Sequence, residues 1–203
     1  MISVVVFDLG GVLCQFRPDA RVHALAVASG WTEAAVREQI WGSGRDTRAD
    51  VGELTAEEAF ALASLDGALD RSTVLRCWAD AFVPNDAVLA LVDRVRVRRA
   101  MLTNNGPVLE ELLAHQLAAI SAHCSPVMLS WRLGAVKPSR AAFDAAAERL
   151  AADPAELLLV DDSPRNVEGA LAVGWDAIAF TKVEQLGEAL AARGLTADGV
   201  TSE

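Results

Sequence analysis

The sequence has few cysteines and no long hydrophobic run. Its 203 residues include three cysteines, Cys14, Cys77 and Cys124, which are widely spaced with no CxxC pattern among them. An odd number of scattered cysteines argues against a disulfide or zinc framework and predicts reduced thiols. The longest apolar run near the N-terminus, Ile2–Phe7, is far shorter than the roughly 20 residues that span a bilayer. No signal-peptide pattern precedes it, so we expect a soluble, cytoplasmic protein.

Positive charge is also scarce. The sequence has 18 Lys and Arg residues against 28 Asp and Glu residues, which gives a formal net charge of −10. Such a protein repels nucleic-acid backbones and anionic lipid surfaces, so we expect no nucleic-acid or membrane partner. Only two of the basic residues are lysines, Lys137 and Lys182. The nearest approach to a basic patch is short and is interpreted as solvated surface: Arg94, Arg96, Arg98 and Arg99.

Hydrophobic residues make up 52% of the sequence, enough for a sizeable core. Five short apolar runs lack an alternating pattern, which is typical of strands buried on both faces of a parallel sheet. Helical stretches separate the later runs and predict a doubly wound, mainly parallel α/β sheet, in which ligands bind at the carboxyl ends of the strands. The predicted strands are Ile2–Asp8, Arg99–Thr103, Pro126–Ser130, Leu157–Asp161 and Asp176–Phe180.

The segment from Gln15 to Val83 has a different character. It contains several helical patterns and no convincing strand, and Thr55-x-x-Glu58 forms a capping-box signature ahead of one helix. We therefore predict a small, all-helical insertion after the first strand that acts as a lid. At the other end of the sequence, Thr196–Glu203 is predicted to be a frayed tail.

Polar residues stand at the ends of the predicted strands. Asp8 closes the first strand ahead of two glycines, where a carboxylate serves as a nucleophile or metal ligand, or only as a turn former or helix cap. Thr103 closes the second strand and offers a hydroxyl for an anion, or only a helix cap. Lys137 follows the third strand and is held extended by Pro138. Its ammonium can reach a phosphate or neutralise carboxylates, although an isolated lysine is usually solvated.

Two adjacent carboxylates, Asp161 and Asp162, close the fourth strand. They repel each other unless they share a cation, and oxygen ligands of this kind suit Mg²⁺; the alternative is a turn with two solvated side chains. Asn166, in the first turn of the next helix, is placed to orient metal-bound water or to satisfy the backbone. Because the carboxyl ends of parallel strands share one edge of the sheet, all of these side chains are expected to converge.

With these residues in these positions, the sequence resembles the haloacid dehalogenase-like (HAD) superfamily over nearly its whole length. The four matching motifs are FDLGGV at Phe7–Val12, LTN at Leu102–Asn104, VKP at Val136–Pro138 and VDDSPRN at Val160–Asn166. The resemblance implies a Rossmann-like core of residues 1–14 and 84–203, with residues 15–83 as the C1 cap of subfamily I. The first motif is similar to that of the branch containing glucose-1-phosphate phosphatases. Response-regulator receiver domains use similar residues but begin with the acidic pair and lack a lid, which makes them a poor alternative.

The resemblance also implies roles for these residues. Asp8 would attack phosphorus to form an aspartyl-phosphate that water hydrolyses, while Thr103 and the amide of Asn104 hold the phosphoryl oxygens. Lys137 would offset the charge that builds up during phosphoryl transfer. The resemblance implies a Mg²⁺ site made of Asp8, the main-chain carbonyl of Gly10, Asp162 and, directly or one shell out, Asp161, with Asn166 behind.

Gly10 departs from the pattern of the family's phosphatases, which usually have a second Asp at this position as the acid/base. Loss of such a group typically costs roughly 10²–10⁴ in rate. The favoured interpretation is a Mg²⁺-dependent phosphatase of a small phosphorylated metabolite, such as a sugar phosphate, acting as a monomer or homodimer. A non-catalytic or regulatory protein with the same fold is the main alternative. A carbon–halogen hydrolase is less favoured, because such enzymes typically have an aromatic residue at this position and do not need the metal site.

Several residues near the lid are harder to place. Four residues lie in or near segments that could face the crevice under the lid: Arg17, Arg45, Arg48 and Trp41. For the arginines, packing at the surface is the favoured interpretation. Cys14 lies a few residues after Asp8, where it could border the site, and buried packing is the favoured interpretation.

Overall fold

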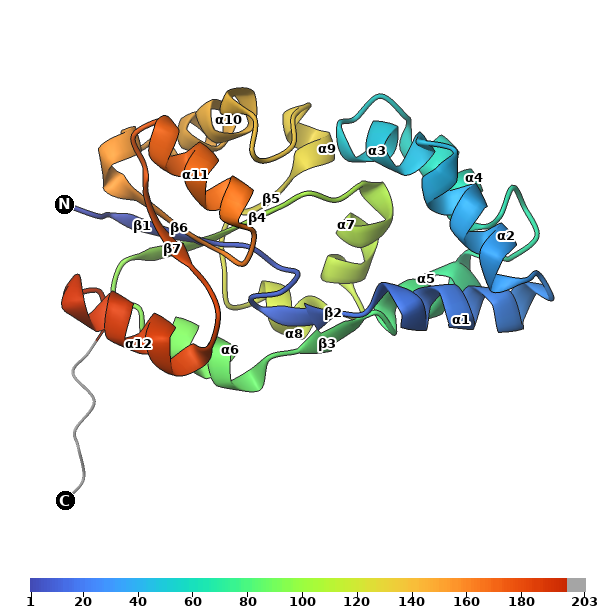
Figure 1. Ribbon diagram of the computed structural model, residues 1–203, viewed down its shortest axis with the longest axis horizontal. Coiled ribbons are helices and arrows are strands. Elements are labelled where there is room, and N and C mark those ends of the chain that lie inside the picture. Colours follow the sequence, from blue (N-terminus) through green and yellow to red (C-terminus); the bar gives the residue numbers. More distant parts are fainter. Residues whose placement is uncertain (197–203) are drawn as a thin grey trace, which may run out of the picture.

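A five-stranded parallel sheet forms the centre of the computed structural model, which describes residues 1–196 (Figure 1). The strand order is β5-β4-β1-β6-β7, and each neighbouring pair runs parallel. This confirms the predicted α/β fold, and each predicted strand is present with its ends shifted by no more than two residues. The strands are β1 (Val4–Phe7), β4 (Arg98–Thr103), β5 (Val127–Leu129), β6 (Leu157–Asp161) and β7 (Asp176–Ala179).

Both faces of this sheet are covered by helices. Val4 and Val6 of β1 pack into one hydrophobic cluster, and Val5 and Phe7 pack into the other, so all four side chains are buried. This explains why the strand sequences show no alternation. One face is covered by α10 (Arg140–Leu150) and α11 (Pro164–Ala172). The other is covered by α6 (Asp86–Val92), α7 (Pro107–Ala114), α8 (Ala118–Ser121) and α12 (Val183–Ala192).

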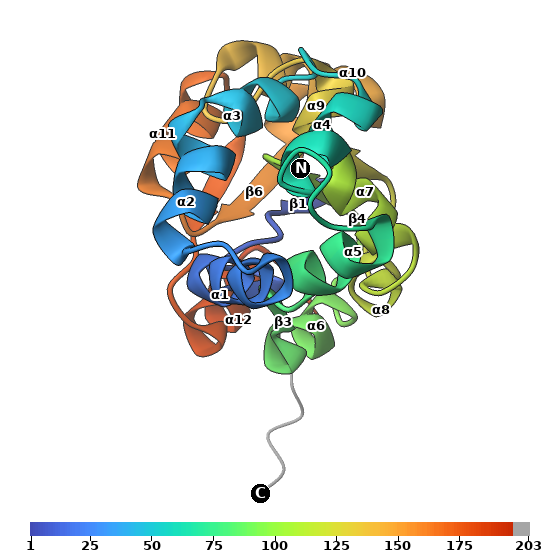
Figure 2. The same ribbon diagram turned by 90° about the vertical axis from the view of Figure 1, so that its right-hand side faces the viewer.

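A helical insertion, residues 17–81, lies beyond the carboxyl ends of the sheet strands, as Figures 1 and 2 show from two directions. The capping box predicted at Thr55 is present, because the Glu58 amide donates to Thr55 Oγ1 at 3.2 Å and the Thr55 amide donates to Glu58 Oε2 at 2.8 Å. Its helices are α1 (Pro18–Ser29), α2 (Glu33–Arg37), the π-helical turn η1 (Glu38–Gly42), α3 (Arg45–Asp50), α4 (Ala56–Ala63) and α5 (Arg71–Ala79).

The expectation that the segment between Gln15 and Val83 contains no strand is wrong. The short strands β2 (Cys14–Phe16) and β3 (Phe82–Pro84) pair antiparallel and join the two ends of the insertion. Each strand has three residues, too few to show a period, and the partners are far apart in the sequence. The two-stranded ribbon therefore fixes where the insertion leaves and rejoins the core.

Two short elements remain, α9 (Ser130–Leu133) and the 3₁₀ turn η2 (Pro154–Glu156). Of the predicted tail, Thr196 pairs with Val95 and is buried, whereas residues 197–203 lie outside the described part of the chain. Within residues 1–196, no helix combines the length and the apolar character that crossing a membrane requires.

Candidate active site

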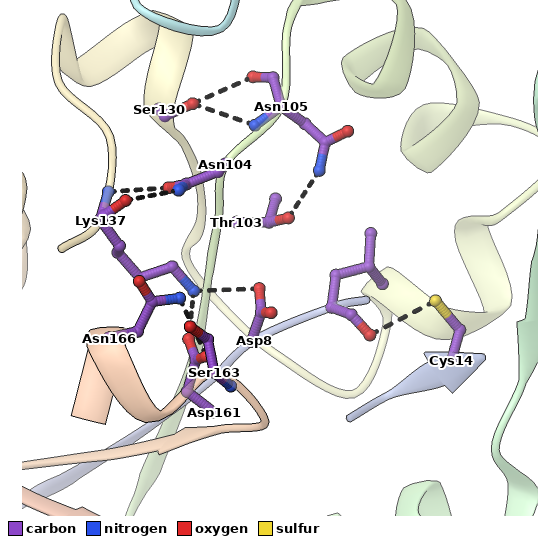
Figure 3. Close-up of polar contacts among 11 residues, drawn as sticks. Asp8, Cys14, Thr103, Asn104, Asn105, Ser130, Lys137, Asp161, Ser163 and Asn166 are labelled. Atoms are coloured by element: carbon purple, nitrogen blue, oxygen red, sulfur yellow. Dashed lines mark hydrogen bonds and ion pairs between the residues drawn. The ribbon is translucent and has the colours of Figure 1, made fainter. Parts of the chain in front are cut away.

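Side chains from three strand ends and one loop meet at the edge of the sheet that faces the insertion (Figure 3). Asp8 directly follows β1, Thr103 ends β4 and Asp161 ends β6. Lys137, from the loop between α9 and α10, points between two of the carboxylates. Its Nζ atom lies 3.0 Å from Asp8 Oδ1 and 2.6 Å from Asp161 Oδ2. The convergence expected from the strand-end positions is therefore present in the fold.

Burial makes these charges interact strongly. Lys137 is 3% exposed and Asp161 is 0% exposed, so water screens their interaction little. Burial alone lowers the pKa of Lys137, but Asp8 and Asp161 outweigh this effect and raise its pKa, so that the ammonium stays charged. Burial and the neighbouring Asp161 raise the pKa of Asp8 to about 6, although Lys137 opposes the shift.

Asp161 and Asp162 have different surroundings although they are adjacent. Asp161 Oδ1 accepts hydrogen bonds from the Ser163 amide and Asn166 Nδ2, both at 2.9 Å, and its Oδ2 contacts Lys137. Both oxygens of Asp161 are thus engaged by protein donors. Asp162, in contrast, is exposed, and one oxygen from each of Asp8, Asp161 and Asp162 falls within 4.8 Å of the others.

This donor set fits a divalent cation that prefers oxygen ligands. Asp8, Gly10 and Asp162 line the same cavity. Asp8 and Asp162 have carboxylate oxygens, and Gly10 has a main-chain carbonyl. Because both oxygens of Asp161 already have donors, the geometry favours Asp161 and Asn166 in an outer, supporting position around such an ion.

The two glycines after Asp8 are not equivalent. Gly11 has a left-handed φ of +82°, and a Cβ there would lie 2.1 Å from Asp162 Oδ2. Only glycine therefore lets the Asp162 side chain come this close to the turn after Asp8. At Gly10 a Cβ would meet Phe16 Cβ at 3.5 Å, an ordinary van der Waals contact. The backbone therefore requires glycine at position 11 but not at position 10.

Asparagines of the loop after β4 hold the site together. The side chain of Asn104 donates to the Lys137 carbonyl at 2.8 Å and accepts from the Lys137 amide at 2.9 Å. Asn105 Nδ2 donates to Thr103 Oγ1 at 2.8 Å. The resemblance implies a role only for the main-chain amide of Asn104. In the structure, the Asn104 side chain anchors the backbone of Lys137 instead of facing a ligand.

A cavity of about 850 Å³ lies between the core and the insertion. Seven of the eight sequence-predicted site residues line it, and the eighth, Asp161, lies directly behind them against Lys137. The seven are Asp8, Gly10, Thr103, Asn104, Lys137, Asp162 and Asn166.

The insertion also contributes polar residues to the lining of this cavity. Arg21, Asp46 and Asp50 line it, and sequence reasoning missed all three. Nothing in the local sequence distinguishes the buried Arg21 from the arginines at the surface, because the aromatic rings around it come from distant segments. Of the other residues considered near the lid, Trp41 and Cys14 both line the cavity. Cys14 is also buried, as expected, with its Sγ donating to the Leu9 carbonyl at 3.3 Å.

The arginines expected at the surface are found there. Arg17 is exposed, Arg45 pairs with Asp66 at 3.0 Å, and Arg48 pairs with Glu53 at 3.1 Å. None of the three lines the cavity among the described residues.

Comparisons with known proteins found a family model and relatives that match most of the chain. A family model for haloacid dehalogenase-like hydrolases matches residues 2–174. The chain is 26% identical over 189 residues to the D-ribitol-5-phosphate phosphatase of Bacteroides thetaiotaomicron, covering 87% of this chain and 90% of the relative. It is 30% identical over 190 residues to a phosphatase of Mycobacterium tuberculosis, covering 85% and 84%.

A solved structure has the same fold. A HAD-family enzyme of Bacteroides thetaiotaomicron, in complex with magnesium and inorganic phosphate, superposes with a TM-score of 0.74. The match covers 92% of this chain and 99% of the other at 18% sequence identity, which supports a common architecture.

Proposed function

The chain belongs to the haloacid dehalogenase-like hydrolase family, and from this membership we propose that it hydrolyses the phosphate monoester of a small metabolite with Asp8 as the nucleophile. One observation carries the proposal. A buried lysine lies between Asp8 and Asp161 at the edge of a parallel sheet, facing a cavity large enough for a small metabolite. The two phosphatase relatives described above are consistent with this chemistry.

In the proposed reaction, Asp8 attacks the phosphorus atom and the ester oxygen leaves. Lys137 contacts Oδ1 of Asp8, so Oδ2 is the oxygen available for attack. The Thr103 hydroxyl and the Asn104 amide hold two phosphoryl oxygens at the start of the loop, and Lys137 offsets negative charge as it builds up. Water then hydrolyses the aspartyl-phosphate, which releases inorganic phosphate and restores Asp8.

We propose Mg²⁺ as the cofactor, held by Asp8, the Gly10 carbonyl and Asp162. The magnesium complex of the structurally similar enzyme supports this choice, as does the set of oxygen donors. When bound, Mg²⁺ supplies electrostatic neutralisation of the phosphoryl group. Asn166 keeps Asp161 in place, and Asp161 in turn keeps Lys137 beside the nucleophile.

The first motif, Phe7–Val12, and the helical insertion support a more specific assignment within the family. We propose that residues 15–83 are a C1 cap of subfamily I, and that the chain acts like the branch of glucose-1-phosphate phosphatases. Because Gly10 supplies no acid for the leaving oxygen, turnover is expected to be reduced with simple alkyl phosphates. Substrates with better leaving groups, such as an anomeric hydroxyl or an acyl phosphate, need less help from an acid.

Phosphate release from sugar phosphates, acyl phosphates and p-nitrophenyl phosphate, with and without Mg²⁺, tests the proposal. We expect Mg²⁺-dependent release by the wild type and at least a roughly 10³-fold loss in Asp8→Asn, as for removal of a nucleophile. Asp144→Asn, an exposed carboxylate on α10, is the matched control and should match the wild type. Equal, slow release by the wild type and Asp8→Asn would support the non-catalytic alternative instead.

A further inference from the structure

We propose that Arg21, Asp46 and Asp50 form a subsite for the leaving group, which selects a neutral, polyhydroxylated group over one that carries a second anion. The inference rests on the proposed function, since it assigns the part of the same cavity that the insertion lines. The three residues are hereafter called the leaving-group subsite. All three come from the helical insertion, Arg21 from α1 and the two carboxylates from α3.

Arg21 is held in an unusual environment for a charged side chain. It is 6% exposed, and its guanidinium carbon lies 5.0, 4.4 and 5.4 Å from the ring centres of Phe16, Trp78 and Phe82. Its Nε and Nη2 atoms are buried without a hydrogen-bond partner among the described residues. Burial lowers the pKa of Arg21 to about 9, and Asp50 and Asp46 oppose the shift. The rings thus fix the guanidinium at the cavity wall without satisfying its donors.

The two carboxylates lie one helical turn apart on α3. Burial raises the pKa of Asp46, and burial together with Asp46 raises the pKa of Asp50 to about 7. Within the described part of the chain, neither carboxylate has an oxygen within 4.0 Å of an Arg21 nitrogen, so they stabilise the guanidinium only at longer range. The wall therefore offers one guanidinium and two carboxylates that are not paired with each other. Asp46 is also hydrogen-bonded to Thr47, and Asp50 to the Gly106 amide, so each carboxylate has only part of its accepting capacity left for a ligand.

Asp50 is fixed relative to the proposed phosphate-binding loop. The Ser130 hydroxyl donates to the main-chain carbonyl of Asp50 at 2.6 Å and accepts from the Asn105 amide at 3.0 Å. In addition, Asp50 Oδ1 approaches the Cβ position of Gly106 to 3.4 Å. A ligand that binds at Thr103 and Asn104 is thus positioned against Asp50 by the protein's own hydrogen bonds.

The charges of the leaving-group subsite determine which leaving groups it binds. A second phosphate or carboxylate on the substrate would meet two acidic side chains and a guanidinium that is partly covered by rings, so repulsion outweighs the single favourable contact. A hydroxyl group both accepts from Arg21 and donates to Asp46 or Asp50, which fills the gap between them. Sugars and alditols carry several such hydroxyls.

The test compares three phosphate esters: ribitol 5-phosphate, 3-phosphoglycerate and p-nitrophenyl phosphate. For the wild type, we expect kcat/KM to be at least about tenfold higher with ribitol 5-phosphate than with 3-phosphoglycerate. Arg21→Met, which keeps the length of the side chain, should lower kcat/KM for ribitol 5-phosphate about tenfold, mainly through KM, the effect of one lost charged hydrogen bond. Its kcat/KM for p-nitrophenyl phosphate, which lacks hydroxyls, should change less than about threefold.

Asp50→Asn gives an independent variant and Arg48→Met a control. Above pH 7, where Asp50 is ionised, Asp50→Asn should narrow the preference against 3-phosphoglycerate, because it removes one of the repelling charges. Arg48→Met changes an arginine on the same helix that pairs with Glu53 outside the cavity, and it should behave as the wild type. Equal losses with all three substrates in Arg21→Met would assign Arg21 a purely structural role and overturn the proposal. A wild type that prefers 3-phosphoglycerate would overturn it as well.

Calorimetric binding separates this proposal from the proposed function. With Mg²⁺ present, Asp8→Asn should bind ribitol 5-phosphate more tightly than 3-phosphoglycerate, and addition of Arg21→Met should abolish that preference. If the wild type releases phosphate from no substrate but this binding preference is found, hydrolysis is wrong and the subsite stands. If hydrolysis occurs and binding shows no preference, the subsite is wrong and the hydrolase stands.

Discussion

Replacement of Gly10 by aspartate should increase turnover of alkyl phosphates. The structure leaves room for the side chain, because a Cβ at position 10 has Phe16 Cβ at 3.5 Å as its nearest contact. Gly10 is also absent from the glycines with positive φ, so the backbone suits any residue. The main-chain carbonyl proposed as a metal ligand is unchanged by the substitution. The new carboxyl group would lie two residues after the proposed nucleophile, at a position that lines the cavity.

The expected magnitude follows from the chemistry of the leaving group. A positioned general acid contributes roughly 10²–10⁴ in rate, which corresponds to about 3–5 kcal/mol of barrier. A further negative charge near Asp8, Asp161 and Asp162 offsets part of this gain, so we expect an increase of about 10² in kcat for ribitol 5-phosphate. p-Nitrophenolate leaves without a proton, and its release should change less than about threefold.

The assay is steady-state phosphate release from both substrates at saturating Mg²⁺, with Mg²⁺ affinity measured by calorimetry. Gly11→Ala is the contrasting variant at the neighbouring glycine and is expected to disrupt the site. A Cβ there would lie 2.1 Å from Asp162 Oδ2, on a backbone with φ of +82°. This variant should lose both activity and metal affinity. Unchanged alkyl-phosphate turnover in Gly10→Asp, with Mg²⁺ affinity retained, would refute the view that the missing acid limits the rate.

Three further substitutions test the site and its cost in stability. Lys137→Met leaves Asp8 and Asp161 without their shared ammonium and should lower the free energy of unfolding by about 3–5 kcal/mol in urea titrations without Mg²⁺; a loss below about 1 kcal/mol would contradict this account. Asp162→Asn should weaken Mg²⁺ binding at least about tenfold by calorimetry with little change in Tm of the metal-free protein. Because burial raises the pKa of Asp50 to about 7, the folded state holds its proton more tightly than the unfolded state, and stability falls as the pH rises from about 4 to 7. Asp50→Asn should therefore match the wild type near pH 4 and exceed it by about 2 kcal/mol above pH 7, after allowance for partial exposure; an equal difference at both pH values would argue against this.

The sheet was predictable because each strand carries its own signal. Leu157–Asp161 is buried at every position, its first four residues are apolar, and the predicted and observed bounds of this strand are the same. Strand β2, in contrast, has the burial pattern of one buried and two exposed residues, and its pairing with Val83 depends on the folded insertion between them. Contacts between distant short segments leave no periodic pattern in the sequence.

The cavity residues that come from the sheet were predictable from the sequence, and those that come from the insertion were not. Asp8, Thr103 and Asp161 end strands or directly follow them, so the topology of a parallel sheet brings them together before any side-chain detail is known. Arg21 is placed by Phe16, Trp78 and Phe82, which belong to β2, α5 and β3. Its role depends on how the helices of the insertion pack, and no local motif records that packing.

The charges of the site explain how an acidic protein can bind an anionic substrate. Asp8, Asp161 and Asp162 contribute three negative charges, and Lys137 balances only one of them. Two negative charges therefore remain at the phosphate end of the cavity, and they repel a phosphate group at short range, where salt screens weakly. One divalent cation balances these two charges, whereas a monovalent cation leaves one. Phosphate binding is therefore expected to depend on a divalent cation, even though Lys137, Thr103 and the Asn104 amide are in place without it.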